Sequence, residues 1–391
     1  VWLWSNFPYR EKQPDVGIDL VAKETLTGEY VAIQCKFYGA DSTINKENID
    51  SFFTASGKSF TTPEGKKKYS RRIIISTTGN WSKHALDALD NQNPPTSKLN
   101  VEDLANSPID WTQFSLDKPQ DLKPRKKKSL RPHQKTAISK VVEGFKTNER
   151  GKLIMACGTG KTFTALKLVE QMVPDGGHCL FLVPSIALLS QTLREWTAES
   201  EKTLHCFAVC SDTKVGRNND SDDISLHDLN FPATTDTKKL GEQIKLLGKK
   251  SGITVIFSTY QSIQVIVNAQ KNQIPEFDLV ICDEAHRTTG AVADGDDLSA
   301  FVKVHDGDAI KSNKRLYMTA TPRVYKDDVK AQAKENNVDF WSMDDEKTYG
   351  PEFHRLGFGE AVGAGLLSDY KVMVLAVDEK HISKTFQRQL A

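Results

Sequence analysis

The stretch "MACGTGKT" at residues 155–162 has the residue types and spacing of a loop that holds phosphate. Its two glycines let backbone N–H groups converge on an anion, and a helix that begins at the lysine points its positive end to the same place. The lysine supplies a cation for the β- and γ-phosphates, and the threonine hydroxyl is placed to bind Mg²⁺. Met155 stands where the usual GxxxxGK[ST] pattern has its first glycine. The residues expected to bind ATP in this loop are Gly158, Thr159, Gly160, Lys161 and Thr162.

A second set of polar residues follows in "FDLVICDEAHR" at residues 277–287. Its apolar residues predict a buried strand that exposes Asp283 and Glu284 at the carboxyl edge of a sheet, where ligands bind in open α/β folds. We expect Asp283 to hold the Mg²⁺ ion, directly or through water. Glu284 is then expected to orient and deprotonate the water that attacks the γ-phosphate.

Near the start of the chain, "GIDLVAKETLTGEYVAIQCKFY" predicts a hairpin of two short strands with a turn around Gly28. Side chains alternate along a strand, so Gln34 and Lys36 share one face. Asp19 lies among apolar neighbours on the other strand, where an unpaired carboxylate is costly to bury. We predict a metal site for phosphodiester cleavage, in which Asp19 binds Mg²⁺, Gln34 adds a neutral oxygen ligand and Lys36 activates water or stabilises charge on the phosphate. Asp15 is the alternative first acid, but it lies in a turn, which is a less rigid mount than a strand.

Strands that alternate with amphipathic helices must position the two nucleotide motifs. Apolar runs occur at "KLIMA", "HCLFLVP", "CFAVC", "ITVIFST", "FDLVICDE" and "KRLYMTAT". Alternation of this kind predicts an α/β fold, with a parallel sheet that carries helices on both faces. The polar segment at 211–250 is expected to be a surface loop followed by a short helix.

The chain changes character near residue 115, where prolines and lysines crowd together. We predict a front domain at 1–115, a basic linker at 116–130, an ATPase lobe at 131–365 and the incomplete start of a second lobe at 366–391. The first residue is Val1 rather than methionine, and "VWLW" opens in mid-pattern, so we expect that the N-terminus has been cut.

The composition is that of an ordinary globular protein, with 38% hydrophobic and 26% charged residues among 391. The 52 basic and 51 acidic side chains leave a formal net charge of +1, so any surface for nucleic acid must be a local patch. No apolar run approaches the ~20 residues of a membrane helix, and we expect no membrane partner. Six cysteines lie mostly in apolar runs, which favours reduced thiols in a cytoplasmic protein.

From about Arg131 to Arg323 these motifs resemble, in order, those of the superfamily 2 helicases and translocases. The resemblance implies that Gln134 of "RPHQ" contacts the adenine base. It also implies that "TATPR", together with "DEAHR", couples hydrolysis to movement. The expected coupling residues are His286, Arg287, Thr319 and Thr321. In "LVPSIALLSQ" and "STYQS" the candidates for contact with a DNA strand are Pro184, Ser185, Thr259 and Tyr260, although such hydroxyls also serve as simple helix caps.

The hairpin resembles the Mrr-like branch of the PD-(D/E)xK nucleases, whose GxD and QxK patterns correspond to residues 17–19 and 34–36. The implied architecture is a restriction-endonuclease-like α/β domain followed by a RecA-like parallel-sheet ATPase lobe. A nuclease joined to a motor in this order looks most like the single-chain type ISP restriction-modification enzymes. That resemblance implies ATP-dependent DNA restriction in a bacterial cytoplasm, on double-stranded DNA, with a second copy of the enzyme as a candidate partner for cutting both strands.

The same resemblance implies a methyltransferase that uses S-adenosylmethionine and a target-recognition domain downstream of this chain. It also implies an arginine finger in a second lobe, so we expect weak or absent ATP turnover by these residues alone. Three alternatives remain: the motor subunit of a type I restriction enzyme, a repair or remodelling helicase whose front domain only binds DNA, and an RNA helicase with an unrelated front module.

Overall fold

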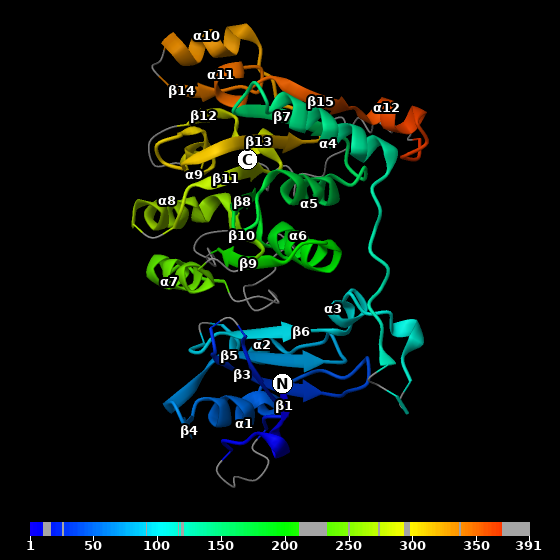
Figure 1. Cartoon of the computed structure of the whole chain (residues 1–391), viewed down its shortest axis with the longest axis vertical. Coiled ribbons are helices and arrows are strands. Elements are labelled where there is room, and N and C mark those ends of the chain that lie inside the picture. The colour runs from blue at the N-terminus through cyan, green and yellow to red at the C-terminus, as the bar shows by residue number, and fades with distance from the viewer. Residues whose placement is uncertain are drawn as a thin grey trace, which may run out of the picture.

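The structure, a computed structural model, describes residues 1–10, 17–25, 27–90, 92–115, 117–118, 121–210, 233–248, 251–272, 274–292, 298–335 and 338–369. Two sheets follow one another along the chain and are stacked along the long axis of the molecule (Figure 1). An extended segment, drawn in cyan, connects them along one side. Among the described residues, no helix is long and apolar enough to cross a membrane.

The first sheet has six strands in the order β1-β2-β3-β5-β4, with β6 beside β5. Its strands are β1 (Trp2–Leu3), β2 (Leu20–Lys23), β3 (Tyr30–Lys36), β4 (Ser59–Thr62), β5 (Gly65–Ser76) and β6 (Thr96–Leu99). Its helices are α1 (Glu47–Ser56), α2 (Lys83–Asp87) and α3 (Val101–Ala105). The predicted hairpin is the antiparallel pair β2 and β3, in which Leu20 lies opposite Ile33. Phe52 of α1 packs with Phe7, Tyr30 and Phe60 in one apolar cluster under this sheet.

The second sheet is entirely parallel, as predicted, with the order β15-β7-β13-β11-β8-β10-β9. Its strands are β7 (Arg150–Met155), β8 (His178–Val183), β9 (Leu204–Val209), β10 (Ile253–Thr259), β11 (Phe277–Cys282), β13 (Ser312–Thr319) and β15 (Glu352–Leu356). The first six are the predicted apolar runs. Strand β15 was not predicted, because it is a half-buried edge strand with polar residues at alternate positions.

Helices cover both faces of this sheet (Figure 1). One face carries α4 (Pro132–Gly144), α5 (Lys161–Met172) and α6 (Ile186–Glu199). The other carries α7 (Thr237–Leu247), α8 (Ile263–Asn272) and α9 (Leu298–Val302). The helix predicted near the end of 211–250 is α7, whereas the loop before it lies largely outside the described residues. Strands buried on both faces must be apolar along their whole length, which explains why the runs do not alternate.

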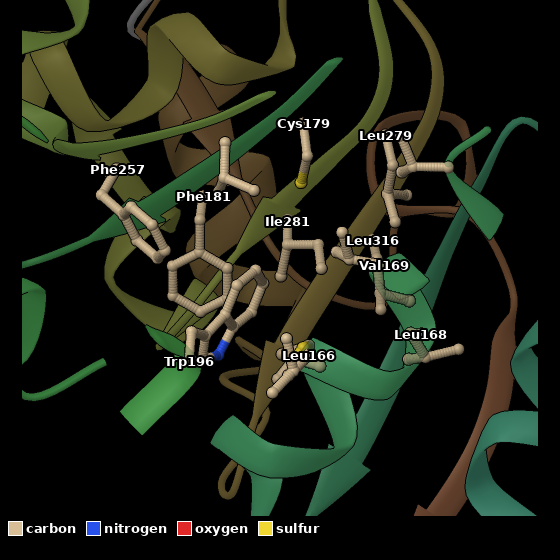
Figure 2. Packing of buried hydrophobic residues seen from close by; sticks show 14 of the residues in the cluster. Leu166, Leu168, Val169, Cys179, Phe181, Trp196, Phe257, Leu279, Ile281 and Leu316 are labelled. Carbon is tan, nitrogen blue, oxygen red and sulfur yellow. The ribbon is translucent and has the colours of Figure 1, made fainter. Parts of the chain in front are cut away.

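Figure 2 shows the core between the sheet and helices α5 and α6. Trp196 lies between two phenylalanines of adjacent strands, with its ring centroid 5.0 Å from that of Phe181 and 5.3 Å from that of Phe257. Leu166 of α5 is fully buried in the same cluster. This packing fixes α5 and α6 against the strands whose ends carry the nucleotide motifs.

Further elements extend the lobe beyond the sheet. They are β12 (Gly290–Val292) paired antiparallel with β14 (Asp339–Trp341), and the helices α10 (Asp327–Glu335), α11 (Glu346–Tyr349) and α12 (Phe358–Gly363). None of them was predicted, because each is too short to leave a periodic pattern or, as in α10, mostly polar. The described part of 366–391 ends at residue 369, so the expected strand of a second lobe lies outside the described residues.

A buried polar cluster holds the chain just after β11. The Nε2 atom of His305 lies 3.0 Å from the carbonyl oxygen of Thr288, and its Nδ1 atom lies 3.0 Å from the hydroxyl of Tyr317. Tyr349 donates a second hydrogen bond of 2.7 Å to the same Thr288 carbonyl. Burial lowers the pKa of His305 to about 4, so the ring is neutral at physiological pH.

We predict that Leu166→Ala destabilises the ATPase lobe by about 2–5 kcal/mol, because it leaves a cavity in a closely packed core. Urea unfolding followed by tryptophan fluorescence measures this loss. Leu246→Ala is the matched control, since Leu246 is 58% exposed on α7 and should change the unfolding midpoint little. Equal effects of the two substitutions would contradict the packing described here.

We predict that His305 makes the lobe sensitive to acid. Its pKa is near 6.5 in the unfolded chain and about 4 when folded, so below pH 6.5 the unfolded state binds the extra proton. Stability should therefore fall between pH 6.5 and pH 4, with a slope of at most about 1.4 kcal/mol per pH unit. The measurement is the thermal midpoint of wild type and His305→Gln across this range. The variant should show the shallower slope, and parallel curves would refute the assignment.

Candidate functional site

The phosphate loop connects β7 to α5 as predicted from its spacing. Gly158 and Gly160 have φ angles of 82° and 84°, which favour glycine. Thr159 is buried and donates a 2.6 Å hydrogen bond to the carbonyl of Ala156, which closes the loop. Lys161 begins α5, and its Nζ atom lies 3.3 Å from the carbonyl of Met155. The loop thus presents the N-terminus of a twelve-residue helix, which attracts anions.

Gln134 braces this loop from the start of α4. Its Nε2 atom lies 3.4 Å from the carbonyl oxygens of both Thr159 and Gly160, and its Oε1 atom accepts a 2.9 Å hydrogen bond from the N–H of Arg131. The Nε2 atom of His133 also lies 3.0 Å from the Thr159 carbonyl. "RPHQ" and the phosphate loop therefore form one unit, and contact between Gln134 and adenine stays a prediction.

Asp283 lies directly after β11, facing the phosphate loop. It is 7% exposed, and its Oδ1 atom is buried without a hydrogen-bond partner among the described residues. Burial, together with the neighbouring charge of Glu284, raises the pKa of Asp283 to about 6, and the charge of Lys161 opposes this rise. An orphaned, buried carboxylate oxygen of this kind is suited to a divalent cation, which would repay its lost solvation.

Glu284 adopts a left-handed conformation with φ 49°, the one positive φ outside glycine in the described part of the chain. A strained residue of this type costs on the order of 1 kcal/mol and is found most often at functional sites. Its Oε2 atom lies 3.3 Å from Nδ1 of His286, and this contact lowers the pKa of Glu284. The carboxylate is therefore held in its ionised form, as a general base requires.

Three of the four residues expected to couple hydrolysis to movement converge beside this acid. The Nδ1 atom of His286 also lies 3.0 Å from Oγ1 of Thr319, which in turn accepts a 3.2 Å hydrogen bond from the N–H of Thr321. One chain of contacts thus joins Glu284 to the "TATPR" turn. Arg287 lies apart from it and points into a groove.

That groove has a volume of about 770 Å³ and opens beside the coupling residues. It is lined by Pro184, Ser185, Gln261, His286, Arg287, Thr289, Phe301, Thr321, Pro322 and Arg323. Pro184 and Ser185, two of the candidates for DNA contact, line this groove, and the Ser185 hydroxyl also caps α6 by accepting a 3.3 Å hydrogen bond from the N–H of Leu188. Two arginines and several neutral polar groups suit a phosphate backbone.

The other two DNA candidates require a correction. Tyr260 is fully buried, and its hydroxyl donates to the backbone carbonyl of Asp283. Thr259 is 4% exposed and donates to the hydroxyl of Ser262. Neither side chain is available to a DNA strand, because both are buried and both hydroxyls already donate to neighbouring groups. Gln261, which donates to the carbonyl of Pro184, is the residue of "STYQS" that lines the groove.

In the first domain, the register of β2 and β3 brings Asp19 beside Gln34. The Oδ2 atom of Asp19 accepts a 2.6 Å hydrogen bond from the N–H of Cys35, and the Nε2 atom of Gln34 donates to the carbonyl of Gly17. The Oε1 atom of Gln34 is buried and has no hydrogen-bond partner among the described residues. Lys36 follows on the same face of β3. The alternative acid, Asp15, lies outside the described residues.

The donor set of this hairpin fits a divalent cation only with outside ligands. One carboxylate and one amide oxygen can bind Mg²⁺, which usually keeps several waters and takes substrate phosphate oxygens. Within the described ranges, no cluster of three His, Cys, Asp or Glu side chains could hold a metal ion by itself. The orphaned Oε1 atom of Gln34 is the observation that favours a ligand here. The sequence alone does not show that this oxygen atom is buried and unpaired, and only the pairing of β2 with β3 reveals it.

Residues 1–121 match the family described as "Restriction endonuclease", and residues 127–324 match the family described as "Type III restriction enzyme, res subunit". A solved structure titled "ATP-dependent Type ISP restriction-modification enzyme LlaBIII bound to DNA" covers the whole chain at 44% identity with a TM-score of 0.80. A probable helicase of African swine fever virus is 27% identical over 247 residues, or 63% of this chain.

The chain spans about a quarter of the length of these relatives, namely 25% of the LlaBIII chain and 24% of the viral protein. The LlaBIII likeness covers both sheets, so nuclease-type and helicase-type domains occur together in this order. The match to the type III restriction enzyme res subunit covers residues 127–324, which is half of the chain. The chain therefore belongs to that family, with a restriction endonuclease domain in front.

Proposed function

We propose that the chain supplies the nuclease and the first motor lobe of an ATP-dependent DNA restriction enzyme of the type ISP kind. The observation that carries this proposal is the presence, in one chain, of two orphaned and buried oxygen ligands: Asp283 Oδ1 beside the phosphate loop and Gln34 Oε1 in the hairpin. The charge of Lys161 acts on Asp283, and Lys36 shares one face of β3 with Gln34, so each oxygen is accompanied by a lysine suited to a phosphate group. Two phosphate-cleaving sites fit a motor coupled to a nuclease.

In the motor, Lys161 and the helix N-terminus bind the β- and γ-phosphates. Thr162 and Asp283 would hold a Mg²⁺ ion, which neutralises charge that develops on the phosphates. Glu284, ionised and fixed by His286, orients the attacking water and accepts its proton. Loss of the γ-phosphate changes the surroundings of Glu284, and His286 passes this change to Thr319 and the groove.

In the nuclease, Asp19 and Gln34 would hold the divalent cation, which polarises the scissile phosphate. Lys36 orients the attacking water and stabilises the negative charge on the phosphate during cleavage. Double-stranded DNA is the proposed substrate, and its backbone would lie along the groove beside Arg287 and Arg323. A bacterial cytoplasmic location and a second copy of the enzyme for cutting both strands belong to the same proposal.

Two further functions fit the same fold. The motor subunit of a type I restriction enzyme shares the order of the two domains and differs in what accompanies it. A repair helicase with a front domain that only binds DNA would need no intact hairpin site. Stimulation of ATP hydrolysis by duplex DNA but not by RNA would argue against an RNA helicase.

We predict that Asp19→Ala and Lys36→Ala abolish cleavage of supercoiled plasmid by the intact enzyme in ATP and Mg²⁺. The first removes a ligand of the proposed cation, and the second removes the group that orients the attacking water and stabilises charge on the scissile phosphate. Both variants should keep DNA-stimulated ATP hydrolysis. Lys161→Ala should lose both activities, since cleavage depends on the motor. Agarose gels and a phosphate-release assay measure the two activities.

The matched control is Lys66→Ala, which removes an exposed lysine from the β4–β5 hairpin of the same domain. It should cut like wild type. If the Asp19 and Lys36 variants cut as well as this control, the front domain is a clamp and the restriction proposal fails. If only Asp15→Ala loses cleavage, the first metal ligand is Asp15.

We predict that Gly160→Ala weakens ATP binding at least about tenfold. Its φ of 84° costs a side-chain-bearing residue roughly 1–2 kcal/mol, and an added Cβ would lie 2.4 Å from Nε2 of Gln134. Titration with a fluorescent ATP analogue measures the change. Gly79→Ala is the matched control, because no atom lies within 4 Å of the position of its added Cβ. An unchanged affinity in Gly160→Ala would separate this loop from nucleotide binding.

A further inference from the structure

Helix α6 contacts the nucleotide site through one side chain. The Nε1 atom of Trp196 donates a 3.0 Å hydrogen bond to the carbonyl of Thr162, the residue proposed to bind Mg²⁺. The indole ring is fully buried between Phe181 and Phe257, so this contact is fixed on both sides. A displacement of the phosphate loop therefore acts directly on α6.

The last turn of the same helix binds the segment that comes from the nuclease domain. Glu199 is buried, and its Oε2 atom accepts a 2.6 Å hydrogen bond from the N–H of Lys128, while its Oε1 atom lies 3.5 Å from Arg125. The Nζ atom of Lys128 pairs with Glu195 at 2.8 Å, and Lys127 donates to the carbonyl of Ser200. The basic run of the predicted linker is thus bound to α6, while the side chains of Arg125 and Lys128 stay about half-exposed.

A third contact reaches the nuclease domain itself. Arg194 of α6 forms an ion pair with Asp103 of α3. Asp103 also accepts a 2.8 Å hydrogen bond from the N–H of Asn100, so it is anchored at the end of β6. Consecutive residues of α6, from Arg194 to Trp196, therefore touch the nuclease domain, the linker and the phosphate loop.

Between α3 and this contact the chain folds back on itself. Ile109 and Pro124 form an antiparallel bridge, Asp110 donates a 2.9 Å backbone hydrogen bond to Lys123, and Arg125 donates one of 2.9 Å to Pro108. These contacts hold the two ends of the segment between Asp110 and Lys123 side by side. The path from the nuclease to α6 is consequently short.

At its other end, α6 is capped by Ser185, which lines the groove proposed for DNA. The helix is one rigid element of fourteen residues. Its N-terminus lies at the groove, and its C-terminal part contacts the nuclease domain, the linker and Thr162. A rigid helix moves as a unit.

We propose that α6 couples the nucleotide state of the motor to the position of the nuclease, with Glu195 and Glu199 as positioning residues that hold the linker on it. This inference rests on the proposed nuclease and motor functions. Movement of the phosphate loop during ATP hydrolysis shifts Trp196, and the same helix carries the linker and α3 with it. A rigid element that contacts two sites can transmit a movement from one site to the other, and α6 contacts both the phosphate loop and the nuclease domain.

The test uses the intact enzyme and measures DNA cleavage per ATP hydrolysed. Lys128→Glu and Glu195→Lys each turn an attractive pair into a repulsive one, and each should lower this ratio about fivefold or more, within the range of ordinary coupling between sites. DNA-stimulated ATP hydrolysis should stay within about twofold of wild type. The double variant restores the attraction and should recover at least half of the wild-type ratio.

Glu143→Lys is the matched control. Glu143 forms an equally short ion pair with Lys146, but both lie on the surface at the end of α4 and away from the nuclease. It makes the same change of charge as Glu195→Lys and should leave the ratio unchanged. The proposal is overturned if the single variants behave like this control, or if the double variant does not recover. Failure of wild type to cut with ATP and Mg²⁺ would instead overturn the proposed function.

Discussion

The strands of a parallel sheet all point their carboxyl ends to the same side, because a crossover returns the chain after each strand, and the crossover helices bury both faces of the second sheet. The sheet is covered by α4, α5 and α6 on one side and by α7, α8 and α9 on the other. Phosphate loop, acidic strand end and "TATPR" turn, which are far apart in the sequence, meet because β7, β11 and β13 lie side by side. The effect of the Lys161 charge on Asp283 and the contact between His286 and Thr319 both depend on that strand order.

Much of this arrangement could be predicted from the sequence. Continuous apolar runs gave six strands of the second sheet, and the spacing of "GTGKT" placed the loop at the start of a helix. The antiparallel pair that carries Asp19 and Gln34 followed from the turn at Gly28. These features are local, so they leave a pattern in a short stretch of residues.

What could not be predicted depends on contacts between distant segments. The sequence shows Tyr260 as a polar residue after a strand. Only the structure reveals that it is buried, with its hydroxyl donating to the backbone carbonyl of Asp283. Strand β15 has too few apolar residues to be recognised, and it is held by pairing with β7. Likewise the lysines at 126–128 look like a solvated linker until Glu195 and Glu199, about seventy residues away, are placed beside them.

The backbone bridge between Ile109 and Pro124 shortens the connection between the two domains, and this has a mechanical consequence. A flexible tether lets a domain search a sphere whose radius grows with the square root of its length. Here the backbone bridge removes most of that length, and the ion pairs on α6 anchor the rest. The front domain is thus held at a set distance from helix α6 of the ATPase lobe. For the proposed reaction, such a connection sets the distance along the DNA between α6 of the motor and the site of cleavage.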